Sequence, residues 1–301
     1  MDQLHLMKVY VAVADEQGFA AGARKLSMSP PAVTRAIGAL EESLGIKLLN
    51  RTTRHVRVTE AGERYLIDAR RILNDVQSAN ELVAGINAKP RGHLTVTAPA
   101  LFGRMFVIPG IVDYLQRYPD TEVDTLFLDR VVNLVEEGID VGIRIGKLPD
   151  SSIRALRVGS VKLVCCASPA YLKQFGIPQH PFELHEHTIV TSLAVKNNMD
   201  WAFTNNQIKE NVKIKPRLKV TTNDAAIEAV KSGFGITRLL SYQVAPYVAS
   251  GELQIVLAPF ETEAEPIHIV HRENHFSSKK VRAFIDLMAE KLRENKMLSL
   301  A

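Results

Sequence analysis

The chain has 301 residues, of which 46% are hydrophobic and 23% charged, as in a folded globular protein. At roughly 100–200 residues per domain, this length predicts two or three domains. No stretch approaches the ~20 uninterrupted apolar residues of a membrane helix, and Met1–Ala14 lacks a cleavable signal pattern, so we expect a cytoplasmic protein with no membrane partner. Two cysteines, Cys165 and Cys166, are too few for a disulfide scaffold or a four-cysteine zinc site.

Positive charge is concentrated near the N-terminus. Seven bases and two acids lie between Arg24 and Arg57, so this segment has a net charge of +5 while the whole chain has +4. A basic N-terminal part on a nearly neutral body favours an anionic partner, with nucleic acid as the first candidate. A solvated basic face is the alternative that charge alone leaves open.

The N-terminal residues predict three helices separated by tight turns. The helices are expected at 3–16, 20–26 and 30–44. Ser29 is a suitable N-cap for the third helix, and Pro30 then occupies the first helical position, where its missing N–H is not needed. Gly45 is expected to end this helix as its C-cap.

A basic hairpin is expected after these helices. Its strands are predicted at 46–49 and 56–58, on either side of the tip. Two helices joined by a tight turn and followed by a basic hairpin are typical of a winged helix-turn-helix, whose second helix enters the major groove while the wing reaches the adjacent backbone. A three-helix bundle with a protein-binding face is the alternative. The predicted DNA-binding residues are Ser29, Pro30, Pro31, Ala32, Thr34, Arg35, Arg51, Thr52, Thr53 and Arg54.

A long helix is expected from Thr59, its N-cap, to about Asn87. Six residues of this helix follow the 3-4 spacing of a coiled-coil seam: Leu66, Ala69, Leu73, Val76, Asn80 and Val83. The spacing predicts pairing with the same helix of a second chain, and the alternative is a face that packs on the body of its own chain.

Strands and helices alternate beyond a hinge-like break at Lys89–Gly92, which predicts a parallel α/β sheet. Strands are expected at 94–98, 123–128, 141–145 and 161–167. Helices are expected at 107–117, 131–137, 224–232 and 281–294, the third capped by Asn223. The ~200 residues of this part exceed one small sheet, so we expect two α/β lobes.

Several segments carry a recognisable pattern. In the N-terminal part they are Phe19–Ser27, Pro31–Ile37, Leu40–Gly45, Leu48–Arg54 and Thr59–Gly62. In the C-terminal part they are Pro99–Gly103, Ile143–Gly146, Ala167–Leu172 and Gly233–Ile236. Together they resemble the LysR-type transcriptional regulators over essentially the whole chain, with the more specific match in the N-terminal part.

The resemblance implies a sequence-specific transcriptional regulator that is not an enzyme and needs no cofactor. Its partners would be double-stranded operator DNA, a small-molecule effector and, as a further candidate, RNA polymerase. The linker helices would hold a homodimer, often assembled into a homotetramer. The resemblance also implies an all-α winged helix-turn-helix followed by an α/β effector domain of two Rossmann-like lobes, similar to periplasmic binding proteins.

The domain boundaries that follow are 1–58 for the DNA-binding domain, 59–88 for the linker helix and 89–301 for the effector domain. Lobe I would contain 92–163 and 268–301, and lobe II would contain 164–267. The two crossing strands are expected near Leu163–Ala167 and Pro266–Val270, and the C-terminal helix would return to lobe I.

The chain departs from the family pattern at two functional positions. Many members place glutamine where this chain has Pro30, so an amide that could bond adenine is replaced by an apolar ring. Many members also hold the effector through a hydroxyl residue after the first strand of the effector domain, where this chain has Pro99-Ala100-Leu101.

The effector is expected beyond the carboxyl ends of the strands, between the two lobes. The predicted effector-binding residues are Pro99, Ala100, Leu101, Phe102, Arg144, Gly146, Thr222 and Asn223. Arg144 and the free N–H groups at helix starts favour an anion, and the apolar run after the first strand favours a hydrophobic part, so an organic acid is the expected class. A structural salt bridge of Arg144 with Asp140 or Asp224 is the alternative.

Three weaker patterns receive a structural interpretation. Three histidines and two glutamates at 180–187 could suggest metal ligands, but a polar surface loop is expected because no helical i, i+4 histidine pair is present. Cys165 and Cys166 lie in an apolar strand and are expected to be inert. Gly233-Phe234-Gly235 lacks the full dinucleotide fingerprint.

Two other classes of protein remain as alternatives to a regulator. One is a DNA-binding module fused to an enzyme domain, which turnover of a bound metabolite would identify. The other is a solute-binding protein, which the basic N-terminal module and the missing signal peptide disfavour.

Overall fold

The computed structural model describes residues 2–51, 56–83, 89–148, 153–193, 199–272 and 278–298. The chain divides into two units. The first contains the chain up to Lys89 and short later segments that include Asn133–Ile139, and the second contains most of the remainder. Within the described ranges, no helix combines the length and the apolar character that a membrane crossing requires.

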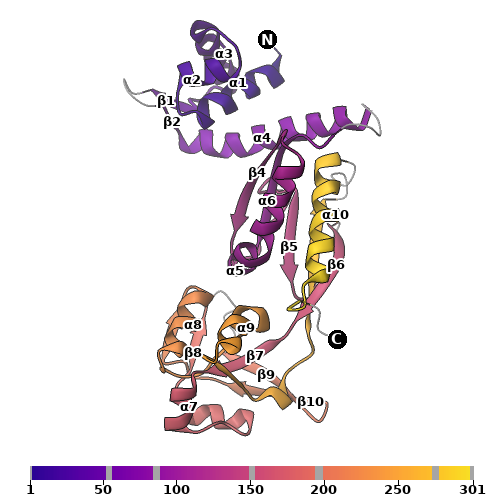
Figure 1. The fold of residues 1–301 in the computed structure, drawn as a ribbon. Helices are drawn as coiled ribbons and strands as arrows, with labels where there is room; N and C mark the ends of the chain where they lie inside the picture. Colours follow the sequence, from indigo (N-terminus) through magenta and orange to yellow (C-terminus); the bar gives the residue numbers. More distant parts are fainter. Residues whose placement is uncertain are drawn as a thin grey trace. The chain divides into compact units, whose positions relative to one another are not determined.

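The first unit begins with three helices, shown in indigo in Figure 1. They are α1 (Gln3–Asp15), α2 (Phe19–Lys25) and α3 (Pro30–Leu44), which confirms the three expected helices. The Ser29 side chain accepts a hydrogen bond from the Ala32 N–H, and Pro30 occupies the first helical position. Gly45 ends α3 in the left-handed conformation with φ +68°, so the predicted caps are confirmed.

Helix α3 packs through one apolar stripe. Val33, Ile37 and Leu40 are fully buried, and they share a core with Val9 and Val13 of α1. Because these residues recur every three or four positions, they fall on one side of the helix and leave the other side in solvent.

The hairpin consists of the antiparallel strands β1 (Leu49–Arg51) and β2 (Val56–Val58). The first strand was expected at 46–49 and instead starts at Leu49. Residue Ile46 still belongs to the end of α3, because its N–H donates to the Glu41 carbonyl while the Gly45 N–H donates to the Glu42 carbonyl. The tip residues Thr52, Thr53 and Arg54 lie outside the described residues.

The long helix is α4 (Glu60–Val83), and the expected continuation to Asn87 lies outside the described residues. The Thr59 hydroxyl accepts a hydrogen bond from the Gly62 N–H, which confirms Thr59 as the N-terminal cap. The Tyr10 hydroxyl on α1 donates to the Gly62 carbonyl at 2.8 Å. The start of α4 is therefore bonded to the three-helix core.

The second unit contains a five-stranded sheet in the order β4-β3-β5-β14-β6. Its strands are β3 (Gly92–Ala98), β4 (Thr121–Phe127), β5 (Val141–Ile145), β6 (Ile153–Val161) and β14 (Glu265–Arg272). Strand β3 is parallel to β4 and β5, but β14 is antiparallel to β5 and β6. The expectation of a wholly parallel sheet is therefore wrong, because the chain leaves this sheet after β6 and returns through β14.

Helical segments cover this sheet. They are α5 (Ala100–Phe102), the π-helix η1 (Gly103–Val107), α6 (Ile108–Arg117) and α10 (Lys279–Glu294). Helices α6 and α10 lie on the same face of the sheet (Figure 1), and Tyr114 of α6 meets Phe284 of α10 edge-on at 5.3 Å. The helix expected at 107–117 begins seven residues earlier, at Ala100.

The other lobe has a three-stranded sheet, a parallel strand pair and a separate hairpin. The sheet β12-β7-β13 comprises β7 (Leu163–Ala167), β12 (Thr237–Leu240) and β13 (Gln254–Val256). Beside it lie β8 (Val190–Ser192), parallel to β11 (Leu218–Val220), and the hairpin of β9 (Asp200–Asn205) and β10 (Ile208–Lys213). Helical segments are α7 (Pro169–Phe175), η2 (Pro181–Glu186), α8 (Asn223–Lys231), α9 (Ser241–Ala249) and η3 (Ala258–Phe260).

Three local expectations are corrected by the structure. The crossings lie at Lys162, between β6 and β7, and at 257–264, before β14, so 163–167 and 266–270 each belong to one sheet. The expected helix at 131–137 is a set of turns, in which the Asn133 side chain accepts from the Val135 N–H and competes with helix formation. Helix α8 starts at Asn223, and Thr222 is its N-cap.

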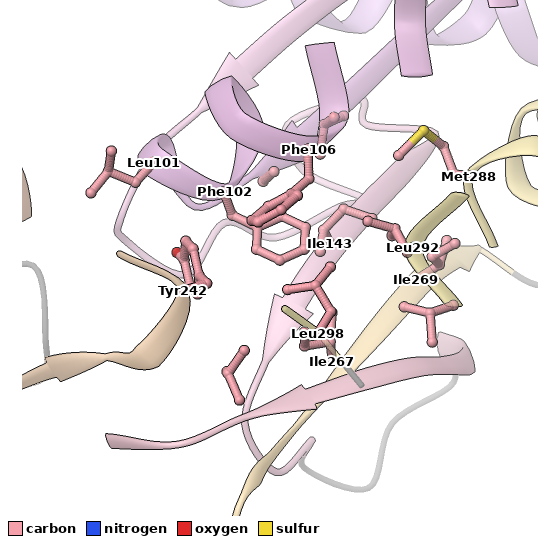
Figure 2. Packing of buried hydrophobic residues seen from close by; sticks show 14 of the residues in the cluster. Leu101, Phe102, Phe106, Ile143, Tyr242, Ile267, Ile269, Met288, Leu292 and Leu298 are labelled. Atoms are coloured by element: carbon pink, nitrogen blue, oxygen red, sulfur yellow. The ribbon is translucent and has the colours of Figure 1, made fainter. Parts of the chain in front are cut away.

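One apolar core extends through both lobes of the second unit. Phe102 and Phe106 lie 4.8 Å apart between ring centroids, and both meet Tyr242 of α9 nearly edge-on. Figure 2 shows this aromatic cluster beside Ile143 of β5. The two lobes are thus joined by packing as well as by the crossing segments.

Substitution of Gly62 and of Gly38 by alanine should change the free energy of unfolding in opposite directions. A Cβ at Gly62 would lie 2.2 Å from the Leu48 carbonyl oxygen, so Gly62→Ala should lower the free energy of unfolding by about 1–3 kcal/mol. A Cβ at Gly38 meets nothing within 4 Å, so Gly38→Ala in α3 should raise it by about 0.5–1 kcal/mol. Urea unfolding of both variants checks this, and equal stability of the two would contradict it.

Candidate nucleic-acid interface and effector site

The solvent side of α3 presents the residues predicted for the recognition helix. Ser29, Pro30, Pro31, Thr34 and Arg35 are exposed. Ala32 is half-buried, because it lies at the edge of the buried stripe. The structure thus places six of the ten predicted DNA-binding residues together at the N-terminal half of one helix. These are side chains that could reach base edges or phosphates from a major groove.

The remaining four residues belong to the wing. The backbone of Arg51 forms the end of β1, and the side chain of Arg51 lies outside the described part, as do Thr52, Thr53 and Arg54. Strand β1 follows α3 after only four residues, so the hairpin begins close to the end of the recognition helix.

Sequence reasoning missed Glu41, which it counted only as an acid in a basic segment. This carboxylate is buried and accepts hydrogen bonds from the N–H groups of Leu48 and Leu49 at 3.0 and 3.2 Å. The Lys47 ammonium donates to the same carboxylate at 2.6 Å. A signal was present, because Glu41 follows Ile37 by four positions and therefore continues the buried stripe of α3.

The seam of α4 divides into two parts. Ala69 is fully buried and Leu66 packs against the core of α1–α3, so these two residues contact their own chain. This packing is on the N-terminal helices, so it decides neither for pairing with a second chain nor for packing on the body. Leu73 and Val76 are half-buried and Asn80 is exposed, while the side chain of Val83 lies outside the described part.

The residues predicted for the effector are divided between surface and core. Leu101 is 4% exposed and Phe102 fully buried, and both belong to the large core. They became core residues because the helical segment starts at Ala100 and turns them inward, and we leave them out of the proposed site. Pro99 and Ala100 are half-buried at the end of β3.

Arg144 and Gly146 lie at the end of β5, both half-buried. The Arg144 guanidinium donates to the Val132 carbonyl at 2.7 Å. Of the two acids considered as its alternative partners, Asp140 accepts from the Thr95 N–H at 2.9 Å, and Asp224 lies 3.5 Å from Arg104. Gly146 has φ +108°, a conformation that L side chains rarely adopt.

In the other lobe, the start of α8 presents Thr222 and Asn223. The Thr222 hydroxyl accepts from the Ala225 N–H. The Asn223 side chain is 4% exposed, and its Oδ1 atom has no hydrogen-bond partner among the described residues. A buried amide oxygen in this state can accept a hydrogen bond from a ligand or a water molecule.

Acidic side chains of the chain itself also occupy these helix starts. The Asp129 carboxylate accepts from the Ala100 N–H at 3.0 Å. Asp224 lies in the first turn of α8 and pairs with Arg104 of η1 across the two lobes. One of the free N–H groups expected to attract an anion is therefore already bonded to a carboxylate.

Two histidines of the segment at 180–187 make contacts with their own chain. His187 lies 3.2 Å from the Tyr171 hydroxyl, and burial lowers its pKa while Glu183 and Glu186 act in the opposite direction. His185 contacts the Lys213 carbonyl. The segment forms η2 and not an irregular loop, and no group of three metal-ligating side chains occurs within the described ranges.

Cys165 and Cys166 are buried free thiols in β7. Burial raises the pKa of each thiol to about 12. Both side chains are therefore protonated at neutral pH, which agrees with the expectation of inert thiols.

Two family descriptions match the chain. "Bacterial regulatory helix-turn-helix protein, lysR family" matches residues 4–63, and "LysR substrate binding domain" matches residues 87–293. The chain is 30% identical over 292 residues to the HTH-type transcriptional activator AaeR of Escherichia coli (strain K12), covering 96% of this chain and 94% of the relative. It is 32% identical over 285 residues to the activator TtdR of the same strain, covering 94% and 91%.

Solved structures show the same architecture. CrgA, a LysR-type transcriptional regulator from Neisseria meningitidis, aligns with a TM-score of 0.63 and 29% identity, covering 97% of this chain and 99% of that chain. The full-length Vibrio cholerae virulence activator AphB, a member of the LTTR protein family, aligns with a TM-score of 0.61 and 27% identity, covering 96% and 99%.

Proposed function

The chain belongs to the LysR family of bacterial transcriptional regulators, and we propose that it reads operator DNA through the exposed side of α3 and the tip of the hairpin. It is a DNA-binding transcriptional regulator with an effector-binding domain. The observation that carries the proposal is the exposed row of Ser29, Pro31, Thr34 and Arg35 on a helix whose other side is buried.

The base-reading groups of this helix are few. Pro30 and Pro31 offer only C–H groups to the groove, while Thr34 and Ser29 can donate or accept hydrogen bonds. Arg35 on the helix and Arg51, Thr52, Thr53 and Arg54 in the wing supply contacts to phosphates, which position the protein on the duplex.

We propose that the DNA-binding domain comprises residues 1–58, the linker helix 59–88 and the effector domain 89–301. Leu73 and Val76 of α4, with Val83 beyond them, form the part of the seam that pairs with a second chain. A symmetric dimer of this kind carries two recognition helices and binds a palindromic site. A homotetramer and contact with RNA polymerase are further parts of this proposal.

We place the effector at Pro99, Ala100, Arg144, Gly146, Thr222 and Asn223, between the lobes. Arg144, whose guanidinium donates to the Val132 carbonyl at the end of β5, is the proposed partner of an acidic group on the ligand. The effector is bound and not turned over, and the protein acts in the cytoplasm, where bacterial DNA lies.

The DNA contacts are tested by salt dependence. Arg54→Ala should weaken binding to all sequences and flatten the slope of log K against log salt by about one unit, because one phosphate contact is lost. Thr34→Ala should change sequence preference instead. Fluorescence anisotropy at several salt concentrations measures both effects. Normal operator binding by the Arg35→Ala, Arg54→Ala double variant would overturn these placements.

Introducing charged side chains into the α4 seam tests the proposed dimer. Leu73→Asp with Val76→Asp would bury unpaired carboxylates in the interface and should give monomers in analytical ultracentrifugation. Ile67→Asp is the control, because Ile67 is 46% exposed and lies about 150° from the seam around the helix. A double variant that dimerises with wild-type affinity would exclude this seam as the interface.

The effector site is tested by thermal shift with a panel of small organic acids. A ligand that binds the folded state should raise the wild-type melting temperature, by roughly RT ln(1 + [L]/Kd) in free energy, and Arg144→Ala should lose most of this gain. Arg154→Ala on strand β6, which β14 separates from the Arg144 strand β5, is the control and should keep it. Equal shifts in wild type and Arg144→Ala, or responses to uncharged ligands alone, would remove Arg144 from the site.

A further inference from the structure

Glu41 joins the recognition helix to the strand that leads into the wing. It lies in the last turn of α3, and its Oε1 atom accepts from the N–H groups of Leu48 and Leu49. Its other oxygen accepts from Lys47. One carboxylate on α3 therefore fixes three consecutive residues at the start of β1.

Two of these three residues, Lys47 and Leu48, are also held by Thr59. The Thr59 hydroxyl lies 2.8 Å from the Lys47 carbonyl and 3.2 Å from the Leu48 carbonyl, and the Thr59 N–H donates to the Leu48 carbonyl. Glu41 accepts hydrogen bonds from N–H groups of this segment, and Thr59 bonds to its carbonyl groups, so the segment is bonded to α3 on one side and to the start of α4 on the other. Of these two attachments, only the bonds to Glu41 connect the base of the wing directly to the recognition helix.

The attachment needs a carboxylate. Burial by itself raises the pKa of Glu41, but the hydrogen bond from Lys47 and those from the N–H groups of Leu49 and Leu48 outweigh burial and hold the pKa below its usual value. Lys47 on the following loop and Tyr10 on α1 are the titratable groups whose charges couple to this carboxyl. The ionised form therefore dominates at neutral pH, and only this form can accept all three hydrogen bonds at once.

We propose that Glu41 is a positioning residue for DNA binding, which sets the wing relative to the recognition helix so that both reach the same duplex. This inference rests on the proposed wing contact of Arg54. A free hairpin would have to be ordered during binding, at the expense of affinity, whereas a hairpin already fixed at its base loses little freedom.

Glu41→Gln tests the proposal, with Glu42→Gln as the matched control. In the amide one oxygen becomes an NH2 group, which faces either the Lys47 ammonium or the N–H groups of Leu48 and Leu49 and can accept from neither. We expect operator affinity to fall about tenfold and the salt slope to flatten by about one unit, as in Arg54→Ala. Glu42 is exposed, and its side chain forms no hydrogen bond with the part of the chain that the structure describes, so Glu42→Gln should bind as tightly as wild type or more tightly.

A double-variant cycle separates positioning from general stability. If Glu41 acts through the wing, Glu41→Gln should cost less affinity in the Arg54→Ala background than in wild type, while the two losses would multiply if it acts elsewhere. Multiplying losses, or a wild-type slope in Glu41→Gln, overturn the inference. If Arg54→Ala itself leaves the slope unchanged, the wing contact in the proposed function fails as well, so the two failures are distinguishable.

A titration of wild-type protein keeps the proposal testable should Glu41→Gln not fold. The folded-state pKa lies below the unfolded value, so the contribution of Glu41 is present above the usual range of glutamate and is lost as pH falls through the lowered pKa. The amide resonances of Leu48 and Leu49 and the affinity for operator DNA should then change with one common midpoint. Loss of affinity at a higher pH than the amide change would overturn the inference.

Discussion

The N-terminal unit depends on a residue that has no side chain. A Cβ at Gly62 would overlap the Leu48 carbonyl oxygen and would lie 2.7 Å from Val58 and 2.9 Å from the Tyr10 hydroxyl. At this one point, the first helix, the base of β1, the second strand of the hairpin and the start of α4 all meet. Because backbone approaches backbone here, the direction in which α4 leaves the three-helix core is fixed by close packing and by the hydrogen bond from Tyr10.

That arrangement separates the parts of the unit by function. The apolar stripe of α3 and the Gly62 contact hold the fold, and they leave the exposed side of the N-terminal half of α3 without structural contacts apart from the Ser29 cap. Pro30 on this exposed side can therefore depart from the family pattern without disturbing the core. We propose that DNA specificity lies on this exposed side, while Gly62, Thr59 and Glu41 hold the elements around it in place.

The sequence predicted this unit well because its signals are local. Ser29, Pro30 and Gly45 mark the ends of α3 by chemistry that acts within four residues, and all three acted as expected. The hairpin start was placed too early at Ile46, because an apolar residue that closes a helix end looks the same as the first residue of a strand. Glu41 was missed because its partners, at positions 47–49, are brought to it only by the turn after the helix.

The effector domain was predicted in outline and not in detail, since its pairings are not local. Strands of three to six residues between 190 and 256 are too short to show a period, and apart from the β9–β10 hairpin their partners lie far away along the chain. Strand β14 completes a sheet whose other strands precede it by more than a hundred residues, which is why a parallel sheet was expected and a mixed one is found. Phe102 changed from site to core for the same reason, because its partner Tyr242 comes from the other lobe, and Leu101 lies in the same core.

The two kinds of contact between the lobes differ in strength, and this difference sets what an effector must do. The Arg104–Asp224 pair is more than half exposed on both sides, and a surface pair of this kind contributes about 0–1 kcal/mol. The cluster of Phe102, Phe106 and Tyr242 is buried, and each of its aromatic pairs adds about 0.5–1.5 kcal/mol to the burial of its area. A ligand shifts an equilibrium between arrangements only by its difference in affinity for them. An effector bound at the proposed site beside Arg144 and Asn223 can replace polar contacts between the lobes at a small cost in free energy. It separates the lobes only if it binds the separated arrangement more strongly by more than the free energy that the aromatic cluster contributes.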